Sequence, residues 1–218
     1  MISVKACIFD LDGVIVDTAK YHYIAWKQLA DELGFSFTED HNELLKGVSR
    51  MRSLDILLEI GHIEKSEEEK QVLAAEKNER YVAYISRMTP EEILPGVTQF
   101  LKGLKEKGIK TALGSASKNA PMILDRIGLL AWFDVIIDGN HVSKAKPDPE
   151  VFLKGAASLK VHPSECIVFE DAIAGIEAAK NGGMRCVGIG DAKVLQNADL
   201  VITGFEDFTA EKLIAHFC

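Results

Sequence analysis

Short apolar runs recur along this chain, and helical patterns separate most of them. The runs are continuous rather than alternating, which is typical of strands buried on both faces of a sheet. They lie at residues 4–9, 111–114, 135–137, 166–169, 186–189 and 200–202. The helical patterns between them lie at residues 97–107, 120–127, 150–159 and 172–181. Because strands that alternate with helices form parallel sheets, we predict an α/β fold with a Rossmann-like, doubly wound parallel sheet.

Residues 18–89 interrupt this alternation, because no strand pattern occurs in them. Helical patterns lie at residues 18–33, 55–60 and 66–88. The last of these opens with Ser66 and has Glu69 three residues later, which is the signature of a capping box. We therefore predict two domains. An all-helical cap domain at residues 18–89 is inserted into a catalytic α/β core domain formed by residues 1–17 and 90–218.

Composition narrows the possible partners. Of the 218 residues, 47% are apolar, which is enough for a large core, and the formal net charge is -8. An acidic surface repels nucleic acid and anionic membranes, so we expect neither as a partner. The first residues do not resemble a signal peptide, and no apolar stretch is long enough to span a bilayer. We expect a cytoplasmic monomer, with Cys7, Cys166 and Cys186 as buried thiols rather than disulfides.

Two carboxylates follow the first predicted strand. Asp10 stands where the apolar run ends, and Asp12 comes two residues later, before Gly13, which permits a sharp turn. Ligands of open α/β sheets bind at the carboxyl ends of the strands. Two carboxylates this close can hold a hard cation, or one can act as a nucleophile while the other moves a proton. For this short motif alone, a solvated turn is an equally good interpretation.

A second acidic pair, Glu170 and Asp171, directly follows the run at 166–169. In a parallel sheet this pair reaches the same edge as Asp10 and Asp12. Four carboxylates at one edge repel each other unless a divalent cation offsets their charge. Mg²⁺ suits such a site, because it takes a few carboxylates together with water and substrate phosphate. Asp171 could instead cap the next helix, and capping and metal binding can coexist.

Hydroxyl and basic groups follow two further strands. Ser115 directly follows the run at 111–114, and Ser117, Lys118 and Asn119 come soon after it. They lie at the start of a predicted helix, where backbone amides can bind an anion. Lys146 lies in a loop stiffened by prolines. Taken singly, these are an ordinary helix cap and a surface lysine. Together with the two acidic pairs they supply a metal site, a nucleophile, an acid/base and a charge clamp for phosphoryl transfer.

The order and spacing of these groups resemble the four motifs of the haloacid dehalogenase superfamily. The first motif is FDLDGVIVDT at residues 9–18, and Ser115, Lys146 and the pair Glu170–Asp171 match the other three. The resemblance covers the whole chain, and its departures are minor: Gly114 replaces an expected alanine, and Lys144 is an extra lysine. It implies that Asp10 carries the phosphoryl group, that Asp12 is the general acid/base, and that Ser115 and Lys146 hold the transferring group. The implied Mg²⁺ ligands are the side chain of Asp10, the backbone carbonyl of Asp12, Glu170 and Asp171.

The cap resembles that of superfamily members that move a phosphoryl group within one sugar. The matching stretches lie at residues 17–30, 44–54 and 76–85, with 114–121 in the core. Those enzymes interconvert β-D-glucose 1-phosphate and glucose 6-phosphate through β-glucose 1,6-bisphosphate. The resemblance therefore implies this isomerase reaction, with Mg²⁺ and the bisphosphate as cofactors and sugar phosphates as partners. The implied substrate-binding residues are Thr18, His22, Trp26, Lys46, Gly47, Val48, Arg50, Ser53, Lys77, Ala116, Ser117, Lys118 and Asn119.

The cap residues allow more than one interpretation. His22 and Trp26 are four apart and share a helical face, but Trp26 alone favours core packing and His22 alone a structural histidine. The guanidinium of Arg50 could bind a phosphate through two parallel hydrogen bonds, or Arg50 could be the charged tip of a solvated loop. A mutase needs a second anion site, because its bisphosphate must turn round between two transfers. Arg50 with Ser117, Lys118 and Asn119 fits that second site.

Two other functions compete with a sugar-phosphate mutase. A phosphatase of the same superfamily would use the same four motifs with water as the final acceptor. It has less need of a second phosphate grip, so loop 46–50 together with His22 and Lys77 favours the mutase. A non-catalytic scaffold would be expected to lack Asp10, Asp12 or the second acidic pair, and the sequence retains all of them.

Overall fold

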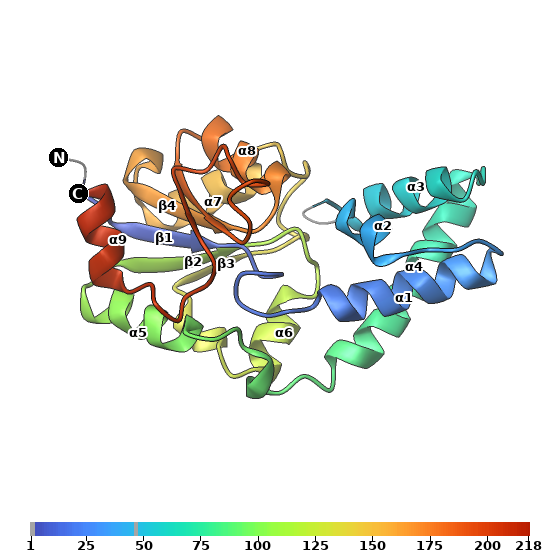
Figure 1. Ribbon diagram of the computed structural model, residues 1–218, viewed down its shortest axis with the longest axis horizontal. Helices are drawn as coiled ribbons and strands as arrows, with labels where there is room; N and C mark the ends of the chain where they lie inside the picture. The colour runs from blue at the N-terminus through green and yellow to red at the C-terminus, as the bar shows by residue number, and fades with distance from the viewer. Residues whose placement is uncertain (1–2, 46–47) are drawn as a thin grey trace.

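A computed structural model describes residues 3–45 and 48–218 of the chain (Figure 1). Within these residues, the strands form one parallel sheet in the order β3-β2-β1-β4-β5-β6. The strands are β1 (Ala6–Phe9), β2 (Lys110–Gly114), β3 (Val135–Ile137), β4 (Cys166–Glu170), β5 (Arg185–Ile189) and β6 (Leu200–Ile202). This is the strand order of doubly wound dinucleotide-binding sheets. The predicted fold class is confirmed, and each predicted strand end lies within two residues of the observed one.

The register of the central strands brings their carboxyl ends to one edge. Phe9 of β1 lies opposite Leu113 of β2 and Phe169 of β4. Asp10 and Glu170, which come next, therefore reach the same edge side by side. The chain order of the strands reverses between β1 and β4, and ligands of open α/β sheets bind in the crevice at such a point.

Helices cover both faces of the sheet (Figure 1). On one face lie α5 (Val97–Glu106), α6 (Ala120–Arg126) and α9 (Ala210–Phe217), and on the other lie α7 (Glu150–Leu159) and α8 (Ile173–Asn181). Short 3-10 helices lie at Pro90–Glu92, Leu130–Trp132 and Pro163–Glu165. Because Ile8 and Phe9 are both fully buried, on opposite faces, the strands read as continuous apolar runs. Gly114 makes room for the ring of Phe152, since an added Cβ would lie 2.8 Å from its Cδ1.

The cap helices lie together beyond the carboxyl edge of the sheet (Figure 1). They are α1 (Ala19–Glu32), α2 (Glu39–Glu43), α3 (Arg50–Ile60) and α4 (Glu67–Ile85). Trp26, Leu54 and Leu57 are among the buried side chains of their shared core. The predicted capping box is confirmed at the start of α4, where the Ser66 amide donates to Glu69 at 2.9 Å and the Glu69 amide donates to Ser66 at 3.2 Å. The division of the chain at residues 17/18 and 89/90 stays a prediction.

The boundaries of some helices differ from those predicted. Helix α3 begins five residues before the predicted start at 55, because the Ser49 hydroxyl accepts a hydrogen bond from the Arg52 amide at 3.3 Å and caps the earlier start. Helix α2 was not predicted, since five residues are too few to show a helical apolar period. Thr38 and His41 form its reciprocal cap. The predicted state of the cysteines is confirmed: Cys7, Cys166 and Cys186 are buried free thiols.

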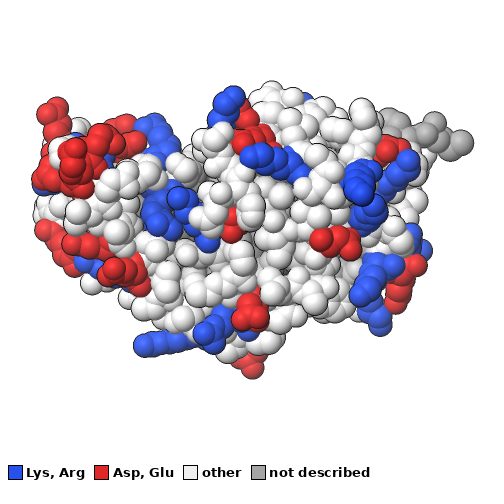
Figure 2. Space-filling model, turned by 180° about the vertical axis from the view of Figure 1, so that it is seen from behind, with Lys and Arg blue, Asp and Glu red and all other residues white. Residues whose placement is uncertain are grey.

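The charge distribution is uneven over the surface. Figure 2 shows Asp and Glu side chains concentrated at the end formed by the cap, whereas Lys and Arg are dispersed in smaller groups over this face. In the described part of the chain, each helix is too short or too polar to cross a membrane.

Candidate active site

Three carboxylates meet at the edge between β1 and β4. The Asp10 amide donates to the Phe169 carbonyl at 3.0 Å, which extends the β1–β4 pairing by one residue and places Asp10 beside Glu170. Carboxylate oxygens of Asp10, Glu170 and Asp171 all lie within 4.8 Å of one another. Glu170 is fully buried and Asp10 is 5% exposed. Such an arrangement of acids needs a cation to offset its charge.

Two glycines leave the space that these acids occupy. A Cβ on Gly13 would collide with the Asp171 carboxylate, and a Cβ on Gly175 would collide with that of Glu170. Gly13 also adopts a φ of +73°, which favours glycine. Three hard oxygen donors in a cradle of this kind fit Mg²⁺. The side chain of Asp12 is not one of these donors. The metal contact predicted for Asp12 is made by its backbone carbonyl, and it stays a prediction.

Lys146 supplies a buried positive charge at the same place. Its Nζ donates to Asp10 Oδ1 at 2.6 Å and also to Glu170 Oε1, and its side chain is 1% exposed. Burial alone would lower the pKa of Lys146, but the negative charges of Asp10 and Glu170 outweigh burial and raise it. For Glu170, burial raises the pKa and the charge of Lys146 opposes the rise. Lys146 is therefore fixed in its charged form next to Asp10, at the carboxylate cluster where its sequence context predicted it.

Asp12 is placed for proton transfer. Its amide donates to Asp10 Oδ2 at 3.1 Å, and its Oδ1 accepts a hydrogen bond from the Thr18 hydroxyl. Burial and the nearby negative charge of Asp10 raise the pKa of Asp12 to about 7. A carboxyl group that titrates near neutral pH can both give and take a proton in turnover. Thr18, predicted on the cap side, thus contacts the predicted acid/base directly.

The loop after β2 forms a string of polar groups at the edge. The Ser115 amide donates to the Ile137 carbonyl at 3.0 Å, and the buried Ser115 hydroxyl accepts from the Ser117 amide at 3.1 Å. The Ser117 hydroxyl in turn accepts from the Asn119 amide at 3.3 Å. Ala116 is half-buried and Lys118 is exposed. The predicted residues 115–119 are therefore one connected loop, which starts at the carboxyl end of β2 and ends at the cap.

On the cap, Lys77 is the centre of a buried polar group. Its Nζ lies 3.0 Å from His22 Nδ1, 4.3 Å from the ring centroid of Trp26 and 4.7 Å from that of Tyr81. Burial and the positive charge of Arg50 lower the pKa of Lys77 to about 7, against the opposing charge of Asp12. Burial, Lys77 and Arg50 also lower the pKa of His22. The structure thus brings His22, Trp26 and Lys77 together, and their predicted contact with substrate stays a prediction.

The other predicted cap residues lie around the start of α3. Arg50 is its first residue, Ser53 is buried one turn later, and the half-buried Val48 precedes the helix. Lys46 and Gly47 lie outside the described residues. The substrate contacts predicted for this group stay predictions.

Two contacting residues were not predicted. Tyr81, on α4, packs against His22 with ring centroids 4.1 Å apart and the rings tilted by 37°. Its position four residues after Lys77 was a signal that could have found it. Asn78 has no such signal. Its Oδ1 accepts a hydrogen bond from Asn119 Nδ2 at 3.1 Å, which joins the core loop to the cap.

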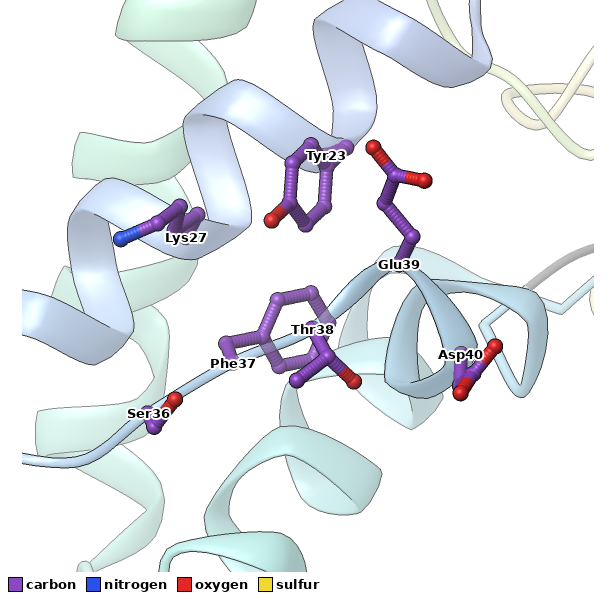
Figure 3. A pocket seen from close by; sticks show the side chains of 7 residues that line it. All are labelled: Tyr23, Lys27, Ser36, Phe37, Thr38, Glu39 and Asp40. Atoms are coloured by element: carbon purple, nitrogen blue, oxygen red, sulfur yellow. The ribbon is translucent and has the colours of Figure 1, made fainter.

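A hollow also lies on the cap, away from Asp10, Glu170 and Asp171 (Figure 3). In it, the rings of Tyr23 and Phe37 have centroids 6.2 Å apart, and the positive charge of Lys27 is paired with Asp31 at 2.7 Å. Residues Ser36, Thr38, Glu39 and Asp40 complete the lining. The three-carboxylate group of the core lies elsewhere, at the sheet edge, so the sheet edge is the candidate active site.

Comparison with known proteins agrees with this geometry. A model of the haloacid dehalogenase-like hydrolase family matches residues 4–183. The chain belongs to this family. It is 47% identical to β-phosphoglucomutase of Bacillus subtilis over 96% of this chain and 93% of that protein. It is 33% identical to a phosphorylated carbohydrates phosphatase of Thermotoga maritima, over 90% of this chain and 92% of the relative.

Solved structures of the family show the same architecture. The crystal structure of β-phosphoglucomutase from Clostridium difficile superposes with a TM-score of 0.95 at 44% identity, over 98% of this chain and 97% of that one. Because this superposition spans nearly both whole chains, it includes the cap as well as the sheet.

Proposed function

We propose that this chain is an isomerase that catalyses the β-phosphoglucomutase reaction, the interconversion of β-D-glucose 1-phosphate and glucose 6-phosphate. The observation that carries this proposal is the 47% identity to the B. subtilis enzyme over almost the whole length of both proteins. This identity extends through the cap, and closure of such a lid over bound substrate completes the site and excludes water. The phosphatase relative shares less of the sequence, at 33%.

We propose that the reaction proceeds through β-glucose 1,6-bisphosphate and a phosphorylated Asp10. A carboxylate oxygen of Asp10 attacks one phosphorus atom of the bisphosphate, and the bond from that phosphorus to the sugar oxygen breaks. The leaving sugar oxygen takes a proton from Asp12. In the other direction Asp12 removes the proton of a sugar hydroxyl, and that oxygen takes the phosphoryl group from Asp10. The pKa of Asp12 near 7 suits both steps.

Charged groups at the sheet edge support this chemistry. Lys146, held against Asp10 at 2.6 Å, would offset the charge of the transferring phosphoryl group, and the Ser115 hydroxyl, at the end of the neighbouring strand β2, would donate a hydrogen bond to it. Asp10, Glu170 and Asp171 would hold Mg²⁺, which supplies further positive charge to the phosphoryl oxygens. The enzyme is therefore expected to depend on Mg²⁺, as its family does.

A second anion site lets the bisphosphate turn round. Arg50 on the cap and Ser117, Lys118 and Asn119 on the core loop are the proposed ligands of the phosphate that is not transferred. The hydrogen bond between Asn119 and Asn78 shows that this loop already reaches the cap. A cap that closes over both sites also keeps water away from the phosphorylated aspartate.

The test follows two products at once. The protein is incubated with Mg²⁺, β-glucose 1-phosphate and a trace of β-glucose 1,6-bisphosphate, and glucose 6-phosphate and free phosphate are both measured. We expect glucose 6-phosphate without matching phosphate release. Phosphate release without glucose 6-phosphate would make the protein a sugar-phosphate phosphatase and would refute the proposed role of the cap.

A further inference from the structure

The distal phosphate site depends on a loop whose two ends are held by different contacts. At its first end, Ser115 is fixed by backbone pairing with Ile137 of β3, at 3.0 Å. Its far end, at Lys118, is exposed and lies beyond the sheet. The side chains proposed to grip the phosphate stand at this far end. Their placement therefore needs a second support.

We propose that the turn at residues 138–141 provides this support, and that Asn140 is a positioning residue for the distal phosphate site. The inference rests on the proposed function of that site. Neither Gly139 nor Asn140 carries chemistry of its own, since their contacts are with the loop and with the turn. Their role is to fix where Lys118 and Ser117 stand.

The turn is itself rigid, because a buried carboxylate organises it. Asp138 is 2% exposed. Its Oδ1 accepts from the Asn140 amide at 2.8 Å and lies 2.7 Å from His141 Nδ1, and its Oδ2 accepts from Asn140 Nδ2 at 3.1 Å. The His141 carbonyl accepts from Lys154 of α7 at 2.6 Å, which ties the turn to a core helix. A carboxylate that accepts several hydrogen bonds holds its donors in one geometry.

The turn then contacts the loop at three points, two of them at its far end. Asn140 Nδ2 donates to the Lys118 carbonyl at 3.3 Å, and the Gly139 amide donates to the Ser117 carbonyl at 3.3 Å. The backbone of Gly139 also packs closely against the loop. A Cβ added there would collide with the Ala116 carbonyl oxygen and would lie 3.0 Å from Lys118 Cγ. The absence of a side chain at 139 thus sets how closely the loop approaches β3.

This arrangement separates two functions of one loop. Ser115 keeps its own anchor on β3 when the turn is altered, so the catalytic end of the loop stays in place. Lys118 loses an anchor, so the distal end is displaced. A change at Asn140 should therefore weaken sugar-phosphate binding while it spares phosphoryl uptake at Asp10.

The experiment compares the variant Asn140→Ala with the wild type and with Asn197→Ala. Asn197 is an exposed asparagine between β5 and β6 and serves as the matched control. Phosphoryl uptake is measured with acetyl phosphate, which carries one phosphoryl group and no sugar. Mutase KM and kcat are measured with β-glucose 1-phosphate, and the melting temperature of each variant is recorded.

We expect Asn140→Ala to raise the KM about three- to tenfold, the effect of one lost hydrogen bond to the loop. Phosphoryl uptake should stay within about twofold of wild type, and Asn197→Ala should change neither quantity. An unchanged KM, or a parallel fall in uptake and turnover with a lower melting temperature, would overturn the proposal. If the wild type releases phosphate in place of glucose 6-phosphate, the proposed reaction fails. The KM for phosphate release then tests the role of Asn140 by the same comparison.

Discussion

Replacing Lys146 with methionine should destabilise the protein strongly when Mg²⁺ is absent. The lysine side chain is 1% exposed, and its Nζ contacts two buried carboxylates, Asp10 at 2.6 Å and Glu170. Methionine keeps most of the apolar stem but removes the charged Nζ, which also lies 4.9 Å from the ring centroid of Phe152. Asp10 and Glu170 then face each other without their shared partner.

The magnitude follows from the burial of the pair. Removing one partner of a buried ion pair costs about 3–5 kcal/mol, because the remaining charge is left uncompensated in a low-dielectric site. For a chain of this length, 1 kcal/mol corresponds to about 2–4 °C of melting temperature. We therefore expect the Lys146→Met variant to melt about 6–20 °C below the wild type in a chelating buffer. Mg²⁺ binds the same carboxylates, so adding it should raise the melting temperature of the variant more than that of the wild type.

The assay is thermal unfolding with and without Mg²⁺, and Lys144→Met is its matched control. Lys144 also pairs with an acid, Asp148 at 3.2 Å, but its side chain is 70% exposed. An exposed pair contributes little, so this control should melt within about 2 °C of the wild type. Equal small shifts for both variants would refute the reasoning, because they would show that the Lys146 pair carries no more stability than a surface contact.

Four further predictions follow from the site. Asp171→Asn should weaken Mg²⁺ activation, with about tenfold or more metal needed for half-maximal activity, and an unchanged Mg²⁺ titration would exclude Asp171 as a ligand. Lys77 has a pKa of about 7 in the folded protein against an ordinary 10.5, so between these values only the unfolded chain binds the proton and stability rises with pH. Lys77→Met should lose this rise in urea unfolding between about pH 7.5 and about pH 9.5, whereas identical pH slopes in both proteins would contradict the assignment. Arg50→Ala should keep phosphoryl uptake but lose mutase turnover, and equal loss in a half-reaction assay would rule that role out. Asp12→Asn should lower kcat about 10²- to 10⁴-fold, and near-normal turnover would remove Asp12 as the acid/base.

The sheet could be predicted because its sequence signal is local. The four central strands are buried on both faces, so short runs of mostly apolar residues mark them, and the polar residue that ends a run marks the edge. Asp10 and Glu170 follow such runs directly, and the parallel register then places them together. The cap helices were harder to delimit. The start of α3 depends on a single hydroxyl, that of Ser49, which caps it before any apolar periodicity begins.

Contacts between distant segments could not be predicted in the same way. The hydrogen bonds from Asn119 to Asn78 and from Asn140 to Lys118 join residues 41 and 22 positions apart, and an isolated asparagine gives no indication of its partner. Asp138 carries no motif either, although its burial makes it the organiser of its turn. Such residues become visible only when the fold has brought the loops together.

Trapping the phosphorylated enzyme tests the central claim most directly. Wild type and Asp10→Asn are incubated with acetyl phosphate and Mg²⁺, their intact masses are measured, and β-glucose 1-phosphate is then added. We predict that the wild type gains one phosphoryl group, that this group passes to the sugar as glucose 1,6-bisphosphate, and that Asp10→Asn gains none. Equal phosphorylation of Asp10→Asn, or a phosphoryl group that passes only to water when the sugar phosphate is present, would contradict the account.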